Sequence, residues 1–226
     1  MPQTLVTTSD PSTAASTSNR YPVMLDLRHA LCLVVGGGNV ARQKIRGLLD
    51  CGATVEVVAP WIHPELEQLD GPIHFRRRRF RTRDLGGMHL VITCTDDPAV
   101  NTRVAAEARD RRIWVNSADD PVNCTFTLPS VARQGDLSVM VSTNGKSPAL
   151  SKWLRRRFEA EFDDSWSALL DVLADVRAEA RAVLGTSELP GWDAAIGDSL
   201  HDLVRAGRAD EAADVLRRHL GLEVTS

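Results

Sequence analysis

The segment Gly36-Gly37-Gly38-Asn39-Val40-Ala41 fits the pattern G-x-G-x-x-A, which is typical of dinucleotide-binding loops. Gly36 permits a tight turn, Gly38 lets the backbone approach a pyrophosphate, and the small Ala41 allows close packing of helix and strand. The phosphates would then face the free N–H groups at the start of the helix. The pattern favours dinucleotide binding over a turn with a purely structural role.

Asp119 is the candidate for proton transfer. It follows the apolar run Ile113-Trp114-Val115, which predicts a strand. A carboxylate just beyond such a strand lines the crevice of an open α/β sheet, where it can accept a proton. An Asx turn or a helix cap before Pro121 is the alternative role. Asp120 is a weaker candidate that a solvated position would also explain, and Thr95 is placed to touch a cofactor.

A second polar segment, Ser142 to Pro148, leads into a predicted helix. A helix N-terminus beside polar side chains can bind carboxylates. We therefore expect substrate contacts from four of its residues: Thr143, Asn144, Lys146 and Ser147. A turn followed by a simple helix cap is the equally weighted alternative.

The elements that position these residues alternate between strands and helices. Apolar runs predict strands at 30–35, 53–58, 73–75, 89–93 and 113–115, with helices from Val40 to Leu49 and from Pro98 onward. Asp96 or Asp97 is expected to cap the second helix. Repeated strand–helix–strand units require a parallel sheet with right-handed crossovers. The sequence thus predicts an α/β fold with a Rossmann-like, doubly wound parallel sheet.

The pattern changes after residue 121. Thr125–Val131 and Leu137–Ser142, joined by Gln134-Gly135-Asp136, predict a β-hairpin appended to the parallel sheet. From Ser147 onward the pattern is helical: one helix beginning at Pro148, then two or three more with a break at 189–191. We therefore expect a disordered tail at 1–19, a dinucleotide-binding domain at 20–121, a β-hairpin region at 122–146 and a helical domain at 147–226.

Composition excludes several functional classes. The net charge is −3, which argues against a nucleic-acid-binding surface, and no apolar run approaches the roughly 20 residues that span a membrane. The four cysteines lie far apart and the six histidines lack metal-ligand spacing, so we expect no bound metal and a reducing, cytoplasmic location. Arginine runs at 76–83 and 155–157 predict solvated faces, with attraction of an acidic substrate or of RNA as the alternatives.

One element of the dinucleotide pattern is missing. The second strand should end in Asp or Glu to hold the adenosine ribose, but Val57-Val58 continues into Ala59-Pro60-Trp61. Glu56 comes two residues early, and no arginine stands there to receive a 2′-phosphate. NAD, held mainly by backbone contacts, is the expected cofactor.

Several ordered segments resemble one protein family. They are Tyr21-Pro22-Val23, Leu33 to Ala41, Thr95 to Asn101, Val115 to Pro121, Phe126 to Pro129 and Val141 to Pro148. Together they resemble the precorrin-2 dehydrogenase/sirohydrochlorin ferrochelatase family, the N-terminal module of siroheme synthase. The resemblance implies NAD-dependent oxidation of precorrin-2 to sirohydrochlorin, often followed by Fe²⁺ insertion, in a homodimer joined through the hairpin region.

The resemblance also assigns roles to individual positions. Asn39 and Val40 match the family's first cofactor-contacting pair, whereas Pro60 and Trp61 align with the second pair but differ in type, so backbone contacts are expected there. Asp119 matches the catalytic aspartate. Thr143 aligns with a family serine of the tetrapyrrole or metal site.

Two other functional classes compete with this hypothesis. Another Rossmann oxidoreductase would turn over NAD with a small substrate in place of a tetrapyrrole. A non-catalytic, NAD-sensing regulator would tolerate the loss of Asp119. The helices after residue 163 depart most from the family pattern, which puts metal insertion in most doubt.

Overall fold

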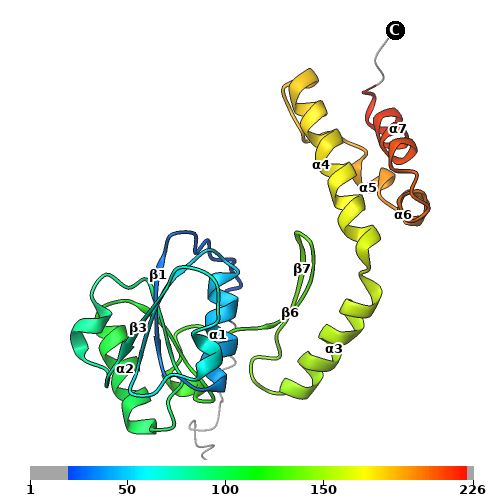
Figure 1. Cartoon of the computed structure of the whole chain (residues 1–226). Coiled ribbons are helices and arrows are strands. Elements are labelled where there is room, and N and C mark those ends of the chain that lie inside the picture. Colours follow the sequence, from blue (N-terminus) through cyan, green and yellow to red (C-terminus); the bar gives the residue numbers. More distant parts are fainter. Residues whose placement is uncertain (1–19, 223–226) are drawn as a thin grey trace, which may run out of the picture. The chain divides into compact units, whose positions relative to one another are not determined.

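The computed structural model describes residues 20–222, which form two compact units that meet in the chain between Thr127 and Leu128 (Figure 1). The predicted tail at 1–19 lies outside the described residues. The first unit holds the glycine loop and Asp119, and the second holds the Thr143–Ser147 segment.

The first unit is built on a five-stranded parallel sheet, which confirms the predicted fold class. The strand order is β3-β2-β1-β4-β5, so the order reverses between β1 and β4. The strands are β1 (Leu31–Val35), β2 (Thr54–Ala59), β3 (Ile73–Arg77), β4 (Leu90–Thr93) and β5 (Trp114–Ser117). Ligands of such sheets bind at the carboxyl ends of the strands beside this reversal.

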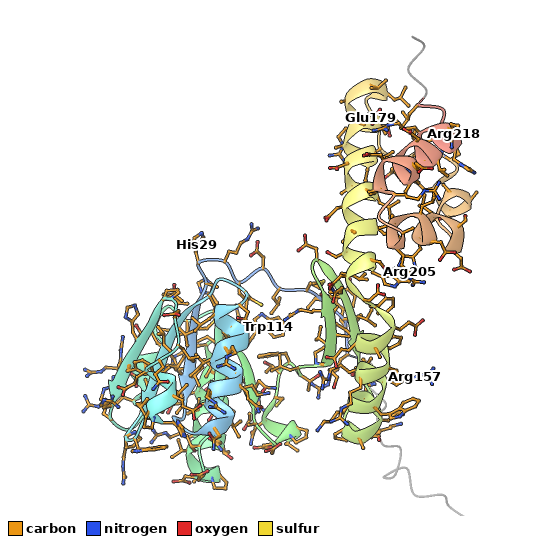
Figure 2. The ribbon with its side chains drawn as sticks, turned by 45° about the vertical axis from the view of Figure 1, so that its right-hand side comes forward. His29, Trp114, Arg157, Glu179, Arg205 and Arg218 are labelled. Carbon is orange, nitrogen blue, oxygen red and sulfur yellow. The ribbon has the colours of Figure 1, made fainter. Side chains whose placement is uncertain are left out.

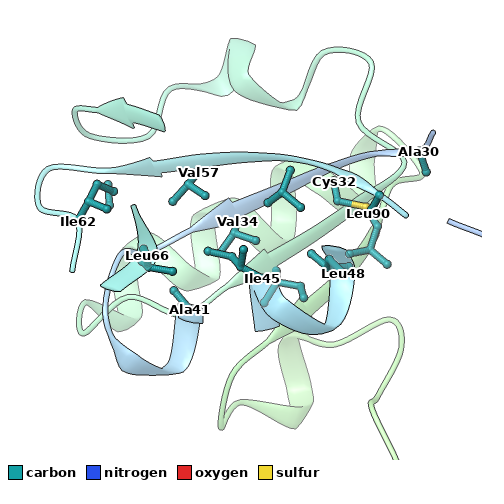
Figure 3. Packing of buried hydrophobic residues seen from close by; sticks show 14 residues of the cluster. Ala30, Cys32, Val34, Ala41, Ile45, Leu48, Val57, Ile62, Leu66 and Leu90 are labelled. Carbon is teal, nitrogen blue, oxygen red and sulfur yellow. The ribbon is translucent and has the colours of Figure 1, made fainter. Parts of the chain in front are cut away.

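One helix covers each face of this sheet. Helix α1 (Asn39–Leu49) buries Ala41, Ile45 and Leu48 against one face, where Figure 3 shows them beside Val34. Helix α2 (Pro98–Asp110) packs on the other face, and Asp97 caps it by accepting hydrogen bonds from two backbone N–H groups, as predicted. Short 3₁₀ turns complete the unit at Pro64–Leu66, Thr82–Leu85 and Pro121–Asn123.

The second unit begins with an antiparallel hairpin, β6 (Ser130–Gln134) and β7 (Leu137–Val141). The predicted first strand, Thr125–Val131, was placed five residues too early. The reason is that the N–H groups of Thr125 and Phe126 donate to Val115 O of β5, so this segment belongs to the first unit. The hairpin also forms a two-stranded sheet of its own and is not appended to the parallel sheet.

Helices make up the rest of the second unit. They are α3 (Pro148–Glu161), α4 (Asp164–Leu184), α5 (Trp192–Ala195), α6 (Asp198–Arg205) and α7 (Ala209–Leu220). The predicted break at 189–191 separates α4 from α5, but four helices follow α3 where two or three were expected, because a single turn forms α5. Helices α4 to α7 enclose a core of their own, with Glu179 on α4 and Arg218 on α7 marked in Figure 2.

Candidate cofactor and catalytic site

The glycine loop joins β1 to α1 with three glycines in three different environments. Gly36 has φ +132°, and a Cβ built on it would lie 2.6 Å from Cys94 O. A Cβ on Gly37 would lie 2.1 Å from Trp61 O, whereas one on Gly38 would meet nothing within 4 Å. Gly36 and Gly37 are therefore required by the protein's own packing. Gly38 faces open space, as a residue approached by a ligand must.

The start of α1 suits a pyrophosphate. Gly38 is its N-cap and supplies no side-chain acceptor to the first-turn N–H groups. Asn39 and Val40 begin the helix, and Val40 is 43% exposed. Unpaired N–H groups at the positive end of a helix bind phosphate. The described residues thus fit a dinucleotide at this loop.

The segment after β2 passes directly over the glycine loop. His63 N–H donates to Gly37 O at 2.8 Å, and the exposed Trp61 ring stands edge-on to the His63 ring at 5.6 Å. Pro60 and Trp61 therefore lie beside the loop, although they are distant from it in sequence. The strand ends in Ala59, and the nearest strand carboxylate, Glu56, pairs with Arg76 Nε at 2.8 Å. Glu56 is consequently committed to an ion pair within the sheet.

Thr95 follows β4, the strand next to β1. Its hydroxyl donates to Asn101 Oδ1 at 2.8 Å, and the same oxygen accepts from Thr95 N–H and from the Thr93 hydroxyl at 2.5 Å. Asn101 Nδ2 donates to Thr95 O at 2.9 Å. Asn101 is buried and satisfies most of the polar groups of this turn. Asn101 therefore fixes the loop that carries Thr95, a role that the sequence pattern did not predict.

Asp119 follows β5, the next strand after β4. Its side chain is exposed and its backbone has φ +57°, in the left-handed region. Ala118 N–H donates to Thr93 O at 2.8 Å, which ties this turn to the end of β4. The carboxyl ends of β1, β4 and β5 therefore present the glycine loop, Thr95 and Asp119 side by side along one edge of the sheet.

The predicted substrate-contacting residues lie in the second unit, at the start of α3. Ser147 caps this helix, because its hydroxyl accepts from Leu150 N–H at 3.2 Å. Thr143 Oγ1 accepts from Ser147 N–H, and Thr143 O accepts from Lys146 N–H. Asn144 has φ +50°. The geometry contains both the predicted turn and the predicted cap, and a role in substrate binding stays a prediction.

Several arginines of the two runs are engaged within the protein. Asp84 is 2% exposed and accepts two hydrogen bonds from Arg78, at 2.8 and 2.6 Å. Arg76 lies 3.6 Å from the same carboxylate. On α3, Arg155 pairs with Glu159, and the Arg157 guanidinium lies 5.3 Å from the centre of the Trp153 ring. These contacts favour structural roles for the paired arginines over attraction of substrate.

The four cysteines are free thiols. Burial raises the pKa of Cys32 to about 11 and that of Cys94 to about 12, so both sulfurs are protonated at neutral pH. Across residues 20–222, no three His, Cys, Asp or Glu side chains gather as metal ligands. No helix in this range has the length and apolar character needed to cross a membrane.

Two family models match the chain. Residues 23–130 match a putative NAD(P)-binding family, and residues 134–161 match the central part of sirohaem biosynthesis proteins. The chain is 36% identical over 203 residues to "Siroheme synthase 1" of Serratia proteamaculans and 37% identical over 199 residues to "Siroheme synthase" of Methylococcus capsulatus. These alignments cover 88% and 86% of this chain. They cover 43% and 42% of the relatives, so the chain spans less than half of their length.

A solved structure extends the match. "SirC, precorrin-2 dehydrogenase" shares 26% sequence identity at a TM-score of 0.63, over 88% of this chain and 98% of that one. The chain belongs to the siroheme-synthase N-terminal module family. The predicted resemblance is thereby confirmed. Within this family module, the first matched model covers the glycine loop, Thr95 and Asp119, and the second covers the start of α3.

The sequence did not reveal that Gly37 packs closely against the backbone of Trp61, or that Asn101 holds the loop that carries Thr95. The unbroken run of three glycines was the available signal for Gly37, because only two of them are needed by the G-x-G-x-x-A pattern. No local signal marks Asn101. Its partners lie six and eight residues earlier, on a strand and its loop.

Proposed function

We propose that the chain is an NAD-dependent dehydrogenase that oxidises precorrin-2 to sirohydrochlorin. The observation that carries this proposal is the placement of Asp119 beyond β5, on the same sheet edge as a glycine loop that fits a dinucleotide. The names of the relatives supply the substrate class: siroheme synthases, and a precorrin-2 dehydrogenase with the same fold.

The reaction removes two electrons and two protons from the tetrapyrrole, as one hydride and one proton. The nicotinamide, when bound, accepts the hydride. The proton requires a base at the substrate edge, and an exposed carboxylate such as Asp119 can receive it. Thr95, held by Asn101, would line the cofactor side of the same crevice.

NAD is favoured over NADP by the residues beside the adenosine end of the predicted site. Ala59-Pro60-Trp61 offers neither a carboxylate for the ribose nor a guanidinium for a 2′-phosphate. We infer that the cofactor is held through backbone groups of Gly38, Asn39 and Trp61. NAD should bind more tightly than NADP, because no cation receives the 2′-phosphate, and the ratio of the two Kd values measures this preference.

The substrate carries many carboxylates. The start of α3 offers a helix N-terminus, a lysine ammonium and hydroxyl groups, which together suit carboxylate binding. In this proposal Thr143, Asn144, Lys146 and Ser147 contact the acidic side chains of the tetrapyrrole. In the same proposal, Fe²⁺ is a second substrate that is inserted into sirohydrochlorin after the oxidation.

The deciding experiment supplies purified protein with precorrin-2 and NAD and follows the absorbance spectrum. Wild-type protein should produce sirohydrochlorin. Asp119→Asn should lower the rate at least 100-fold, with an NAD affinity within about twofold of wild type. A parallel series with Fe²⁺ tests metal insertion separately. No sirohydrochlorin with wild-type protein would overturn the proposal, and unchanged turnover in Asp119→Asn would instead fit a different base.

We also propose that the protein is located in the cytoplasm, since free cysteines are typical of a reducing compartment. We further propose that it is a homodimer. Apolar side chains remain exposed just before the hairpin, on the hairpin and on α3, namely Leu128, Met140, Leu150 and Trp153, at 45–53% exposure. Large apolar side chains that stay exposed on such elements can be covered by a second copy of the chain. Sedimentation analysis should give a dimer for wild type and a monomer for Met140→Glu. A wild-type monomer would contradict the dimer and leave the proposed reaction standing.

A further inference from the structure

The backbone of Asp119 is held in an uncommon conformation. Its φ of +57° lies in the left-handed region, which glycine adopts freely but other residues occupy at a cost. The residue is exposed, so burial of its own side chain does not enforce this conformation. Strained backbone of this kind persists where the surroundings hold it, and it occurs often at active sites. Side chains within the next five residues, Asp120, Asn123 and Cys124, hold this turn in place.

Asp120 uses its carboxylate within the turn. Its Oδ2 accepts from Asn123 Nδ2 at 2.6 Å and, more weakly, from the Ser117 hydroxyl at 3.5 Å. Asn123 in turn links the turn to α2, where Nδ2 reaches Thr102 Oγ1 at 3.3 Å and Oδ1 accepts from Arg109 at 3.4 Å. The carboxylate of Asp120 is therefore engaged within the protein, whereas Asp119 Oδ atoms accept no hydrogen bond from any of residues 20–222.

Cys124 closes the same turn from its other end. Its sulfur accepts from Ser117 N–H at 3.2 Å, and its thiol can donate to Ser117 O at 3.2 Å or to Asp120 O at 3.3 Å. Asn116 Nδ2 lies 3.6 Å from the same sulfur and donates to Phe126 O at 3.1 Å. The sulfur thus contacts the backbone on both sides of Asp119. It occupies the position that a buried water often takes inside a loop.

We propose that Asp120 and Cys124 are positioning residues that hold Asp119 toward the tetrapyrrole, and that Asp120 is not itself the base. The inference rests on the proposed function, because it assigns roles around the same reacting edge. The two adjacent aspartates carry the same side chain, but they have opposite environments. Asp119 is exposed and accepts no hydrogen bond from residues 20–222, whereas Asp120 belongs to a hydrogen-bond network that spans β5, the turn and α2.

The two aspartates can be separated by matched substitutions. Asp120→Asn keeps an oxygen that accepts from Asn123, so it should retain kcat within about threefold. Asp120→Ala removes the acceptor and should lower kcat about tenfold, because a small displacement of a reacting group costs rate. The KM for NAD should stay within about twofold in both. A loss in Asp120→Asn as large as that in Asp119→Asn would make Asp120 the base and overturn the assignment.

Cys124 gives an independent test. Cys124→Ser keeps a donor and acceptor and should retain most of kcat, whereas Cys124→Ala should lower it about tenfold. Cys51→Ala, which removes a partly buried thiol at the end of α1, is the matched control and should leave kcat unchanged. A merely structural role would lower the thermal midpoint and kcat together and would show no rescue by serine. Equal kcat in Cys124→Ala and wild type would also overturn the proposal.

Hydrogen exchange of the peptide 115–126 separates this inference from the proposed function. The exchange of this peptide should be faster in Asp120→Ala and Cys124→Ala than in wild type, and unchanged in Asp119→Asn. Faster exchange together with an inactive wild type would leave the network in place and reject the dehydrogenase. Full wild-type activity with unchanged exchange and unchanged kcat in both alanine variants would reject the positioning roles alone.

Discussion

The two units of this chain bury their apolar side chains in different ways. In residues 20–127, helices α1 and α2 enclose both faces of one parallel sheet, and strands β1, β2, β4 and β5 are mostly buried. In residues 128–222, the core lies among α4 to α7, and from 128 to 162 only Ala132 and Ser151 are buried. The first unit depends on close backbone approach, which needs glycine. The core of the second unit depends on the volumes of its apolar side chains, a requirement that produces no recognisable sequence motif.

Each unit also contains a polar network in which a charged or titratable side chain is shielded from water. In the first unit, Arg78 and the Arg81 N–H group bind the buried carboxylate of Asp84. In the second unit, His201 is 7% exposed and joins Ser165 of α4 to Arg205 of α6. Four substitutions, one for each packing feature and one for each network, test whether this division of roles holds.

The largest loss of stability is expected from Leu216→Ala. Leu216 is fully buried in the core of α4 to α7, so its truncation should lower the free energy of unfolding by about 3–4 kcal/mol. Val183→Ala on α4 is the control, since Val183 is 67% exposed and should cost less than about 0.5 kcal/mol. Urea denaturation measures both. Similar losses in the two variants would show that side-chain volume does not govern the second unit.

Gly37→Ala should come next, at about 2–3 kcal/mol, because the added methyl group would meet the backbone oxygen of Trp61. Gly38→Ala meets open space and should cost no more than about 1 kcal/mol, yet weaken NAD binding clearly. Chemical denaturation and NAD titration of the two variants separate the roles. The division fails if Gly38→Ala is the more destabilising change.

His201→Ala should cost about 2 kcal/mol. It removes the contact at 2.7 Å between His201 Nε2 and the Ser165 hydroxyl and the packing of the ring on Trp166, with ring centres 4.1 Å apart. His219 is exposed, and His219→Ala should have little effect. Thermal unfolding monitored by circular dichroism tests the pair. Equal midpoints for both variants would mean that the network adds nothing to the packing of α4 on α6.

The smallest effect, about 1 kcal/mol near neutral pH, is expected from Asp84→Asn. Burial favours the neutral acid, but hydrogen bonds from Arg78 and the Arg81 N–H group outweigh it, so the pKa of Asp84 is lowered below 3.8. A depressed pKa stabilises the fold above about pH 4, and this contribution is lost as pH falls through the folded-state pKa. The urea midpoints of wild type and variant should therefore converge toward pH 3. A gap that stays constant between pH 7 and pH 3 would contradict this.

The first unit could be predicted almost entirely from the sequence. Parallel strands covered on both faces are continuous apolar runs, so β1, β2 and β4 stand out, and glycines and Pro98 mark where helices begin. The hairpin was harder to place. Thr125 and Phe126 have strand-forming side chains, but they pair with Val115 of the first unit, and this choice depends on contacts between distant residues.

The positions of the site residues could be predicted from the sequence, but the hydrogen bonds and ion pairs that connect residues could not. The glycine loop and Asp119 stand at strand ends that the alternating pattern reveals. The partners of the arginine run could not be foreseen, since Glu56 and Glu67 lie on other elements and pair only once β2 and β3 are side by side. The sulfur of Cys124 gave no local signal either, because its role is set by a turn that folds back on it.

The packing of Cys94 against the glycine loop has a practical consequence. Its sulfur lies 2.9 Å from the position of a Cβ on Gly36, and its thiol is almost wholly protonated at neutral pH because its pKa is near 12. Alkylating reagents attack the thiolate, so this sulfur should react slowly while it packs against the loop and faster in molecules whose loop has moved away. The rate of alkylation of the Cys94 thiol therefore measures how readily the glycine loop opens, and the reporting residue is one that the protein already contains.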